Sequence, residues 1–271
     1  MTLPLSNVLA AIQRLAPLEF AEPWDNVGLL LEPTAVGSAA PLAHALLTVD
    51  LSDEIVDEAA ALGAGLIIAY HPPIFHGLKR LRSSEPAERV ILRCVRHGIA
   101  IFSPHTALDA APGGVNDWLL DAFTLSERGP CAPNPADPRY GQGRLGRLAE
   151  PLALPDAVTL IKSHLGLAQV RVSPATTYVG AAKLISRVAV CAGSGGAVFE
   201  PLSGFDLFLT GEMRHHDVRS RAQSGTSVVL CDHTNTERGY LRILAARLAR
   251  ETSDALSFHV SQCDRDPLTI V

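Results

Sequence analysis

The chain has 271 residues, of which 47% are hydrophobic and 19% charged, enough for one large domain or two modest ones. Its 23 Lys and Arg face 28 Asp and Glu, and the net charge of −5 argues against binding nucleic acid by neutralising phosphates. No apolar run approaches the roughly 18 residues of a membrane span, and the N-terminus lacks the blocks of a signal peptide. The sequence therefore predicts a cytoplasmic protein with no membrane partner. Its five scattered cysteines suggest buried, reduced thiols.

Alternating strand and helix patterns run through the first half of the chain. Apolar positions with helical spacing predict a first helix capped by Ser6, and a second helix is expected to begin near Ser52. Regular alternation of this kind predicts an α/β fold with a mostly parallel sheet. The predicted strands cover 44–52, 65–72 and 98–105, and the later helices cover 86–98 and 113–123.

A segment rich in proline and glycine, residues 126–143, interrupts this alternation and is predicted to be a linker between two α/β lobes. After it the pattern resumes with strands and helices up to residue 225. We therefore predict a first lobe formed by residues 1–125 and 226–271, and a second lobe formed by residues 144–225.

Three apolar, strand-like runs each end on a histidine, namely His71, His105 and His233. A carboxylate follows two of them four residues later, as Asp109 and Glu237. Parallel sheets bind ligands at the carboxyl ends of their strands, and imidazole together with carboxylate can bind a transition metal. The pattern indicates a metal or catalytic cluster, and the alternative is that each histidine is a hydrogen-bonded strand end.

A second polar cluster follows the apolar run DLFLT and contains Glu212, His215 and His216. Adjacent helical residues point about 100° apart, so His215 and His216 cannot both face the same ion. The segment is either the lining of a cavity or a capped, solvent-exposed helix face. The glycine turn at 192–196 has neither a dinucleotide nor a P-loop pattern and favours a tight structural turn over a phosphate site.

Six motifs occur in order along the chain: WDNVGLL, YHPPIF, SPHTALDAAPGGVNDWL, GE with RHHD, DHTNTE and DRDPL. This set resembles the NIF-three-like family, dinuclear-metal and hexamer-forming proteins that are also labelled GTP cyclohydrolase I type 2. The resemblance implies metal ligands at His71, Asp109, His233 and Glu237, with Glu237 bridging two ions, and a proton-transfer or orienting role for His105. Tyr70 stands where the family has the first histidine of a pair, so lower occupancy is expected at one ion.

The resemblance further implies two α/β lobes with mixed, mostly parallel sheets, and a homohexamer built as a trimer of dimers. Its central cavity would be lined by Tyr70, Glu212, His215 and His216. Two divalent ions per subunit (Zn, Mn, Fe or Co) would support hydrolysis of GTP at the purine ring or of another nucleotide or phosphoester. The alternative is a non-catalytic metal-binding scaffold, such as a transcriptional co-regulator, that acts through a protein partner.

Overall fold

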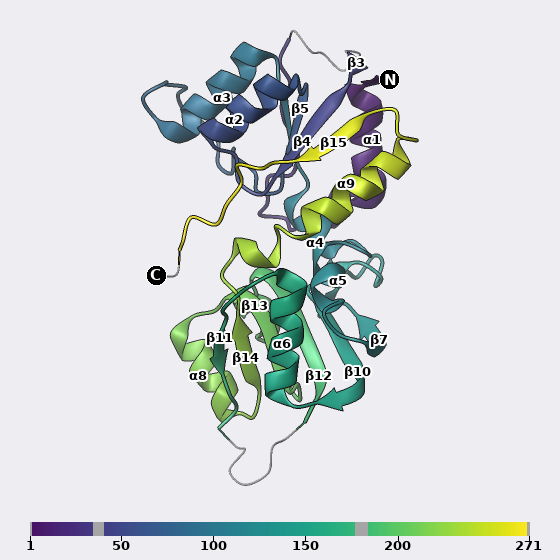
Figure 1. The fold of residues 1–271 in the computed structure, drawn as a ribbon, viewed down its shortest axis with the longest axis vertical. Helices are drawn as coiled ribbons and strands as arrows, with labels where there is room; N and C mark the ends of the chain where they lie inside the picture. The colour runs from purple at the N-terminus through teal and green to yellow at the C-terminus, as the bar shows by residue number, and fades with distance from the viewer. Residues whose placement is uncertain (1, 35–40, 177–183, 270–271) are drawn as a thin grey trace. The chain divides into compact units, whose positions relative to one another are not determined.

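The computed structural model describes residues 2–34, 41–176 and 184–269 (Figure 1). The chain forms two compact units, one from Met1–Leu108 with Leu241–Val271 and one from Asp109–Tyr240. Each unit is an α/β structure with its own sheet, mostly parallel in the first unit and mixed in the second, which confirms the predicted fold class. Within the described residues, no helix is both long enough and apolar enough to span a bilayer.

The first unit is built on a five-stranded sheet in the order β15-β4-β5-β6-β2. Neighbouring strands are parallel except β2, which runs antiparallel to β6. The helices are α1 (Leu5–Leu15), α2 (Asp53–Leu62), α3 (Pro86–His97), α4 (His105–Ala110) and α9 (Tyr240–Glu251), with a 3-10 turn at Leu18–Phe20. The strands are β1 (Leu3–Pro4), β2 (Gly28–Leu31), β3 (Pro41–Leu42), β4 (His44–Thr48), β5 (Leu66–Ala69), β6 (Ala100–Ser103) and β15 (Ser257–Val260).

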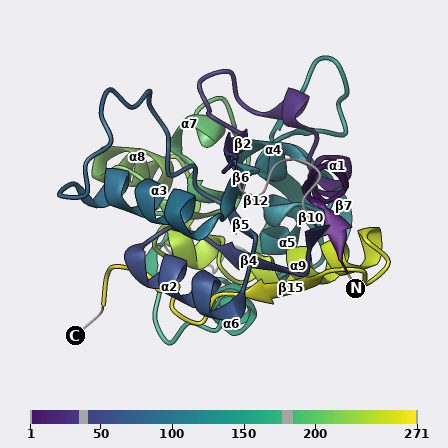
Figure 2. The same ribbon diagram turned by 90° about the horizontal axis from the view of Figure 1, so that it is seen from above.

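Both faces of this sheet are buried, which explains why its strands read as continuous apolar runs. Helices α2 and α3 cover one face, whereas α1 and α9 lie on the other (Figures 1 and 2). Helix α2 begins where the sequence predicted, because the Ser52 hydroxyl accepts a hydrogen bond from the Ile55 amide. The predicted Ser6 cap was wrong, because α1 already begins at Leu5 after Pro4.

The second unit is built on a six-stranded sheet in the order β11-β14-β13-β12-β10-β7. Strands β12, β13 and β14 are parallel, and the remaining pairs are antiparallel. Helices α7 and α8 cover one face and α6 the other (Figure 2). The strands are β7 (Leu125–Gly129), β8 (Ala132–Pro133), β9 (Gly141–Gln142), β10 (Arg144–Leu152), β11 (Arg171–Ser173), β12 (Ile185–Ser194), β13 (Leu207–Glu212) and β14 (Ser227–Leu230). The helices are α5 (Val115–Leu120), α6 (Leu154–Leu165), α7 (Gly196–Phe199) and α8 (His215–Gln223), with a 3-10 turn at Thr234–Thr236.

The units divide the chain differently from the predicted lobes. The segment 126–143 is no simple linker, because it contains part of the edge strand β7 and the small β8-β9 hairpin. The prolines of this segment lie outside β7, and Pro133 lies in the two-stranded β8-β9 hairpin, where each strand leaves one row of backbone groups unpaired. Strand β14 also belongs to the second unit, where it pairs with β13 after the α8 crossover. The prediction that the chain returns to the first sheet is met later, from Leu241 onward.

All five cysteines are free thiols, and four of them are buried. Burial raises the pKa of Cys94, Cys131 and Cys231 to about 12, so these thiols stay protonated and pack as small apolar groups. This agrees with the reduced, structural role expected from their scattered positions.

Arg144 is the charged centre of the second unit's core, only 2% exposed at the start of β10. Its guanidinium forms an ion pair with Asp117 at 3.0 Å. It also donates hydrogen bonds to the backbone carbonyls of Gly141, Gly143, Ala110 and Ala111. One side chain therefore joins β10, α5, the turn before β10 and the end of α4, whose last two residues belong to the second unit.

We expect Arg144→Met to destabilise the protein by about 3–5 kcal/mol, because it removes the closest cation from the buried Asp117 carboxylate, which keeps only Arg128 at 3.6 Å and the Gly113 amide. Arg139→Ala is the matched control, since Arg139 pairs with Asp137 on the surface, where such pairs contribute about 0–1 kcal/mol. Urea unfolding followed by circular dichroism measures both. Equal losses in the two variants would contradict the role assigned to Arg144.

Candidate metal-ligand and proton-transfer site

The histidines predicted to follow strands do so in the structure. His71 follows β5 and His105 follows β6, and these two strands are parallel neighbours in the first unit. His233 follows β14 in the second unit. The predicted first lobe, which joined residues 226–271 to 1–125, was therefore wrong for the strand before His233, because periodicity marks a buried strand without saying which sheet it joins.

In the first unit, three rings gather at the carboxyl ends of β5 and β6. The imidazole centroids of His71 and His105 are 5.3 Å apart, with the rings nearly perpendicular. Tyr70 packs its ring edge-on against both, at 5.2 Å and 5.7 Å, and is only 2% exposed. The Ser103 hydroxyl bonds to the Tyr70 carbonyl and joins the two strand ends. Two imidazoles are thus held at fixed orientations over a buried phenol ring.

Each of these imidazoles has a carboxylate against its Nδ1 atom. Asp50, which follows β4, lies 2.9 Å from Nδ1 of His71, and Asp25 lies 2.8 Å from Nδ1 of His105. A carboxylate at Nδ1 favours the tautomer that carries its proton there, which puts the lone pair on Nε2. Both rings are therefore oriented to offer Nε2 as a ligand or proton acceptor.

Asp25 is the most enclosed of these carboxylates, with a fully buried side chain. Burial raises its pKa, but hydrogen bonds from His105 and Thr106 outweigh that effect, and the net pKa lies below the usual value. His105 itself has a φ of +24°, a conformation that L-residues rarely adopt. Strain of this kind is maintained where surrounding contacts fix a residue, and here the Asp25 contacts do so.

In the second unit, His233 and Glu237 converge as their spacing suggested. Nε2 of His233 lies 3.4 Å from Oε1 of Glu237, and its Nδ1 lies 3.2 Å from the Glu212 carboxylate. Glu237 is 3% exposed, so a carboxylate is held inside the protein beside an imidazole. His233 thus repeats the arrangement of the other two histidines, with a carboxylate behind Nδ1.

The backbone at Gly193 leaves space for these two donor atoms. A Cβ atom at this position would lie 2.8 Å from both Nε2 of His233 and Oε1 of Glu237. The residue has φ +61°, and its amide donates to the Thr236 hydroxyl, which fixes the close approach. A buried carboxylate and an imidazole that face one unfilled position are a donor set suited to a divalent transition metal.

Asp109, the remaining predicted ligand, also belongs to the second unit. Its backbone carbonyl accepts a hydrogen bond from Asn116, whose own side chain accepts one from the Ala192 amide beside Cys191. Burial raises the pKa of Cys191 well above its usual value, and the negative charges of Asp109 and Glu237 contribute to that rise. Both predicted carboxylate ligands therefore lie near Cys191, whose neutral thiol is unsuited to nucleophilic attack.

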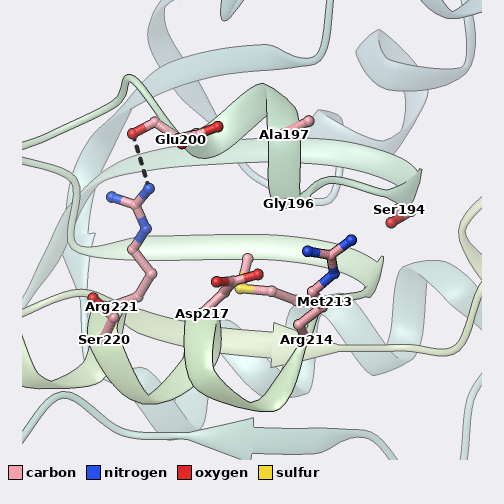
Figure 3. A pocket seen from close by; sticks show the side chains of 9 residues that line it. All are labelled: Ser194, Gly196, Ala197, Glu200, Met213, Arg214, Asp217, Ser220 and Arg221. Carbon is pink, nitrogen blue, oxygen red and sulfur yellow. Dashed lines mark hydrogen bonds between the residues drawn. The ribbon is translucent and has the colours of Figure 1, made fainter.

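The glycine turn between β12 and α7 is structural, as the sequence favoured. The amides of Gly193 and Gly195 donate to the hydroxyls of Thr236 and Thr210, and that of Ala192 to Asn116. Beyond the turn is an open pocket of about 550 Å³ between α7 and α8 (Figure 3). Its charged lining comes from Glu200, Arg214, Asp217 and Arg221.

The predicted cavity residues Glu212, His215 and His216 do not line this pocket within the unit. His215 and His216 are exposed at the beginning of α8, with rings 5.3 Å apart, whereas Glu212 is the residue that faces His233. Their predicted role in a cavity of the assembled oligomer stays a prediction.

Sequence reasoning missed Asp25 and Asp50 as members of the site. Asp50 lies inside the predicted strand 44–52, whereas the observed strand β4 ends at Thr48 and leaves Asp50 after the strand end, like the histidines. Asp25 lies inside WDNVGLL, but its partner is 80 residues away in the chain, and no spacing rule connects the two.

Comparison with known proteins agrees with this architecture. The family described as Duf34/NIF3 (NGG1p interacting factor 3) matches residues 3–267. The chain belongs to this family. NIF3-like protein 1 of Drosophila melanogaster is 39% identical over 98% of this chain and 89% of its own length. A NIF3 homologue of Schizosaccharomyces pombe is 38% identical over 97% of both chains. The crystal structure of a Bacillus cereus protein related to NIF3 shares the fold, with a TM-score of 0.87, 21% identity and 99% coverage of each chain.

Membership of the Duf34/NIF3 family and the donor chemistry agree on one general conclusion. His71, His233 and Glu237 are side chains that could hold a metal ion. The number and identity of the ions, and any reaction they support, belong to the proposal below.

Asp25→Asn is expected to destabilise the protein by about 1–3 kcal/mol at neutral pH, because the charged acceptor for His105 and Thr106 is lost. A carboxyl whose pKa is lowered by folding stabilises the protein above its unfolded pKa, about 3.9, and that stabilisation disappears as the pH falls through the folded value. The difference from the parent protein should therefore shrink below about pH 4.

Urea unfolding at a series of pH values measures this difference. Asp121→Asn serves as the control, because Asp121 forms an exposed pair with Arg128. A difference for Asp25→Asn that stays constant down to pH 2 would contradict the assigned contact.

Proposed function

We propose that this protein is a metal-dependent hydrolase in which His71, Asp109, His233 and Glu237 hold two divalent ions of the Zn, Mn, Fe or Co type. The family resemblance supplies this ligand set. The observation that supports it best is the repeated carboxylate behind Nδ1 of His71, His105 and His233. Metal-binding histidines commonly have such a partner, which fixes the tautomer and makes the ring a better donor.

The remaining side chains differ in what they contribute. Glu237, buried beside His233, is the carboxylate assigned to bridge the ions. Tyr70 is a weaker donor than the histidine it replaces, because a phenol has a pKa near 10 and is neutral at physiological pH. We therefore propose a lower occupancy at the ion next to Tyr70 than at the ion next to His233.

His105 is the residue proposed to move a proton. With its proton held on Nδ1 by Asp25, its Nε2 can accept a proton from an attacking water and return it to a leaving group. Divalent ions, when bound, supply Lewis acidity that makes water more acidic and neutralises charge on a phosphate or carbonyl oxygen. The substrate class proposed is a nucleotide or related phosphoester, including ring-opening hydrolysis of GTP as the family label implies.

A second candidate is a metal-binding scaffold that acts through a protein partner. The presence of Tyr70 in place of a histidine ligand favours it, and so does the family description as an interacting factor. The proposed assembly under either function is a cytoplasmic homohexamer, which size-exclusion chromatography with light scattering would test.

The amount of metal bound by single variants distinguishes the metal ligands from residues that only lie near them. We expect His233→Ala to lose most of the bound metal, because it removes the imidazole beside Glu237. Glu212→Gln keeps every ligand but should weaken metal affinity about 10- to 100-fold, since it removes only the partner of Nδ1. Elemental analysis and calorimetric titration of the metal-stripped protein measure both.

His259→Ala is the matched control, because His259 pairs with His44 on β4 at 3.2 Å and has no part in the proposed site. Unchanged metal content in His233→Ala, or an equal loss in the control, would reject the ligand assignment.

Gly193→Ala tests the shape of the site without removing a donor. The new methyl group would crowd His233 and Glu237 at 2.8 Å and strain a backbone of φ +61°. We expect at least a tenfold loss in metal affinity while both ligands remain. Gly63→Ala has a similar φ of +70° and nothing within 4 Å, and so controls for the backbone strain alone. Equal metal affinities in the two variants would show that the space at Gly193 is irrelevant.

Turnover decides between the two candidate functions. Nucleotides and phosphodiesters are assayed with the metal-loaded parent, with Asp109→Ala and with His105→Gln. A hydrolase should lose activity about 100-fold or more in both variants. Activity that survives Asp109→Ala would indicate a contaminant, and full metal content without turnover on a broad panel would favour the scaffold.

A further inference from the structure

Two aromatic side chains are exposed beside the first unit's histidines. Trp24 is 60% exposed and Phe75 is 39% exposed, with ring centroids 6.1 Å apart and planes inclined at 50°. Trp24 follows the 3-10 turn after α1, and Phe75 follows β5 in the loop that begins at His71. A single exposed apolar side chain is ordinary, but two neighbouring aromatic rings form a contiguous apolar patch, which is the kind of surface that contacts ligands or partners.

Neighbouring polar residues hold both rings in place. The Asn26 side chain donates to the carbonyl of Ile74, which ties the segment carrying Trp24 to the residue before Phe75. Asp25 is fixed by His105 and Thr106. These hydrogen bonds fix the residues adjacent to Trp24 and Phe75. The two exposed rings therefore form a preorganised surface.

This surface borders the candidate site. The ring of Trp24 lies edge-on to His105, with centroids 6.2 Å apart, and His105 in turn lies 5.3 Å from His71. A planar group resting on Trp24 would therefore stand next to the residue proposed to transfer a proton.

The loop after Phe75 adds positive charge to the same region. Lys79 and Arg80 are exposed, and neither forms an ion pair in the described part of the chain. Arg82, in contrast, is paired with Glu85 and Glu88. The charge of Arg80 also helps to lower the pKa of Glu88, so Arg80 is partly engaged with that carboxylate, whereas Lys79 is simply exposed. They lie four and five residues after Phe75 in the same loop, and their long side chains can extend toward an anion.

We propose that Trp24 and Phe75 form a stacking surface for the base of a nucleotide, and that Lys79 and Arg80 contact its phosphates. The inference deepens the proposed hydrolase function, because it assigns the substrate's recognition groups beside the same site. Aromatic stacking tolerates any base, so the surface selects planar anionic compounds as a class and leaves base identity to other contacts.

Intrinsic fluorescence provides a direct test, since the chain has two tryptophans. Trp118→Phe removes the other one, which lies in the second unit against His164 and Tyr240, and leaves Trp24 as the only reporter. The metal-stripped variant is titrated with GMP, GTP, guanosine, ribose 5-phosphate and a short single-stranded oligonucleotide. We expect GMP and GTP to quench the fluorescence with saturation, GTP more tightly, and ribose 5-phosphate to have no effect.

Calorimetry on further variants then assigns the contacts. Trp24→Leu should weaken GTP binding roughly 10- to 100-fold, and the double variant Lys79→Ala with Arg80→Ala about tenfold, with a reduced dependence on salt. Ile243→Ala, which changes another exposed apolar residue of the first unit, should leave binding unchanged. Circular dichroism confirms that each variant is folded.

The results separate this inference from the hydrolase proposal, because binding is measured without metal. Saturable quenching by GTP supports the stacking surface even if no turnover is found. Absence of quenching, or full binding by Trp24→Leu, overturns it even if the protein is a hydrolase. Tighter binding of the oligonucleotide than of GTP overturns the assignment to free nucleotides. Trp24→Leu that changes only the oligomeric state would instead identify the surface as a contact between copies.

Discussion

The hydrogen bond between a carboxylate and Nδ1 of an imidazole is the interaction on which the candidate site depends. It occurs three times, at His71, His105 and His233, with carboxylates from three different elements. A histidine without such a partner exchanges between tautomers and rotates, so its Nε2 lone pair has no fixed direction. The partners are therefore what makes these strand-end histidines suited to bind a cation or carry a proton.

The folds of the two units explain why such partners are available. Parallel strands bring their carboxyl ends to one edge, so Asp50 after β4 and His71 after β5 are neighbours because β4 and β5 are neighbours. In the second unit, β13 and β14 are parallel in the same way and bring Glu212 beside His233. One topological rule thus produces the same pairing in both units. His105 is the exception, because its partner Asp25 comes from a segment preceding the antiparallel strand β2.

The parts of the fold that depend on local sequence were predictable, and those that depend on long-range pairing were not. The Ser52 cap and the apolar runs ending at the three histidines were visible in the sequence, because each is encoded within a few residues. The sheet to which β14 belongs was not, since a buried strand looks alike in either sheet. The 126–143 segment was misjudged for a related reason. Its prolines exclude a central strand, but they do not exclude an edge strand such as β7 or a short hairpin.

The same distinction applies within the site. The family motifs pointed to His71, His233 and Glu237, which the structure shows as side chains that could hold a metal ion, whereas the contacts of Asp25 and Gly193 needed coordinates. The packing role of Tyr70 is visible in the three-dimensional structure and not in the sequence. Its ring is buried against both His71 and His105 and supports the orientation of each, a packing role that a phenol fulfils as well as an imidazole. As a ligand, however, a neutral phenol is the poorer group. A chain with tyrosine at this position therefore keeps the geometry of the first unit's histidines, because the buried ring packs against both of them.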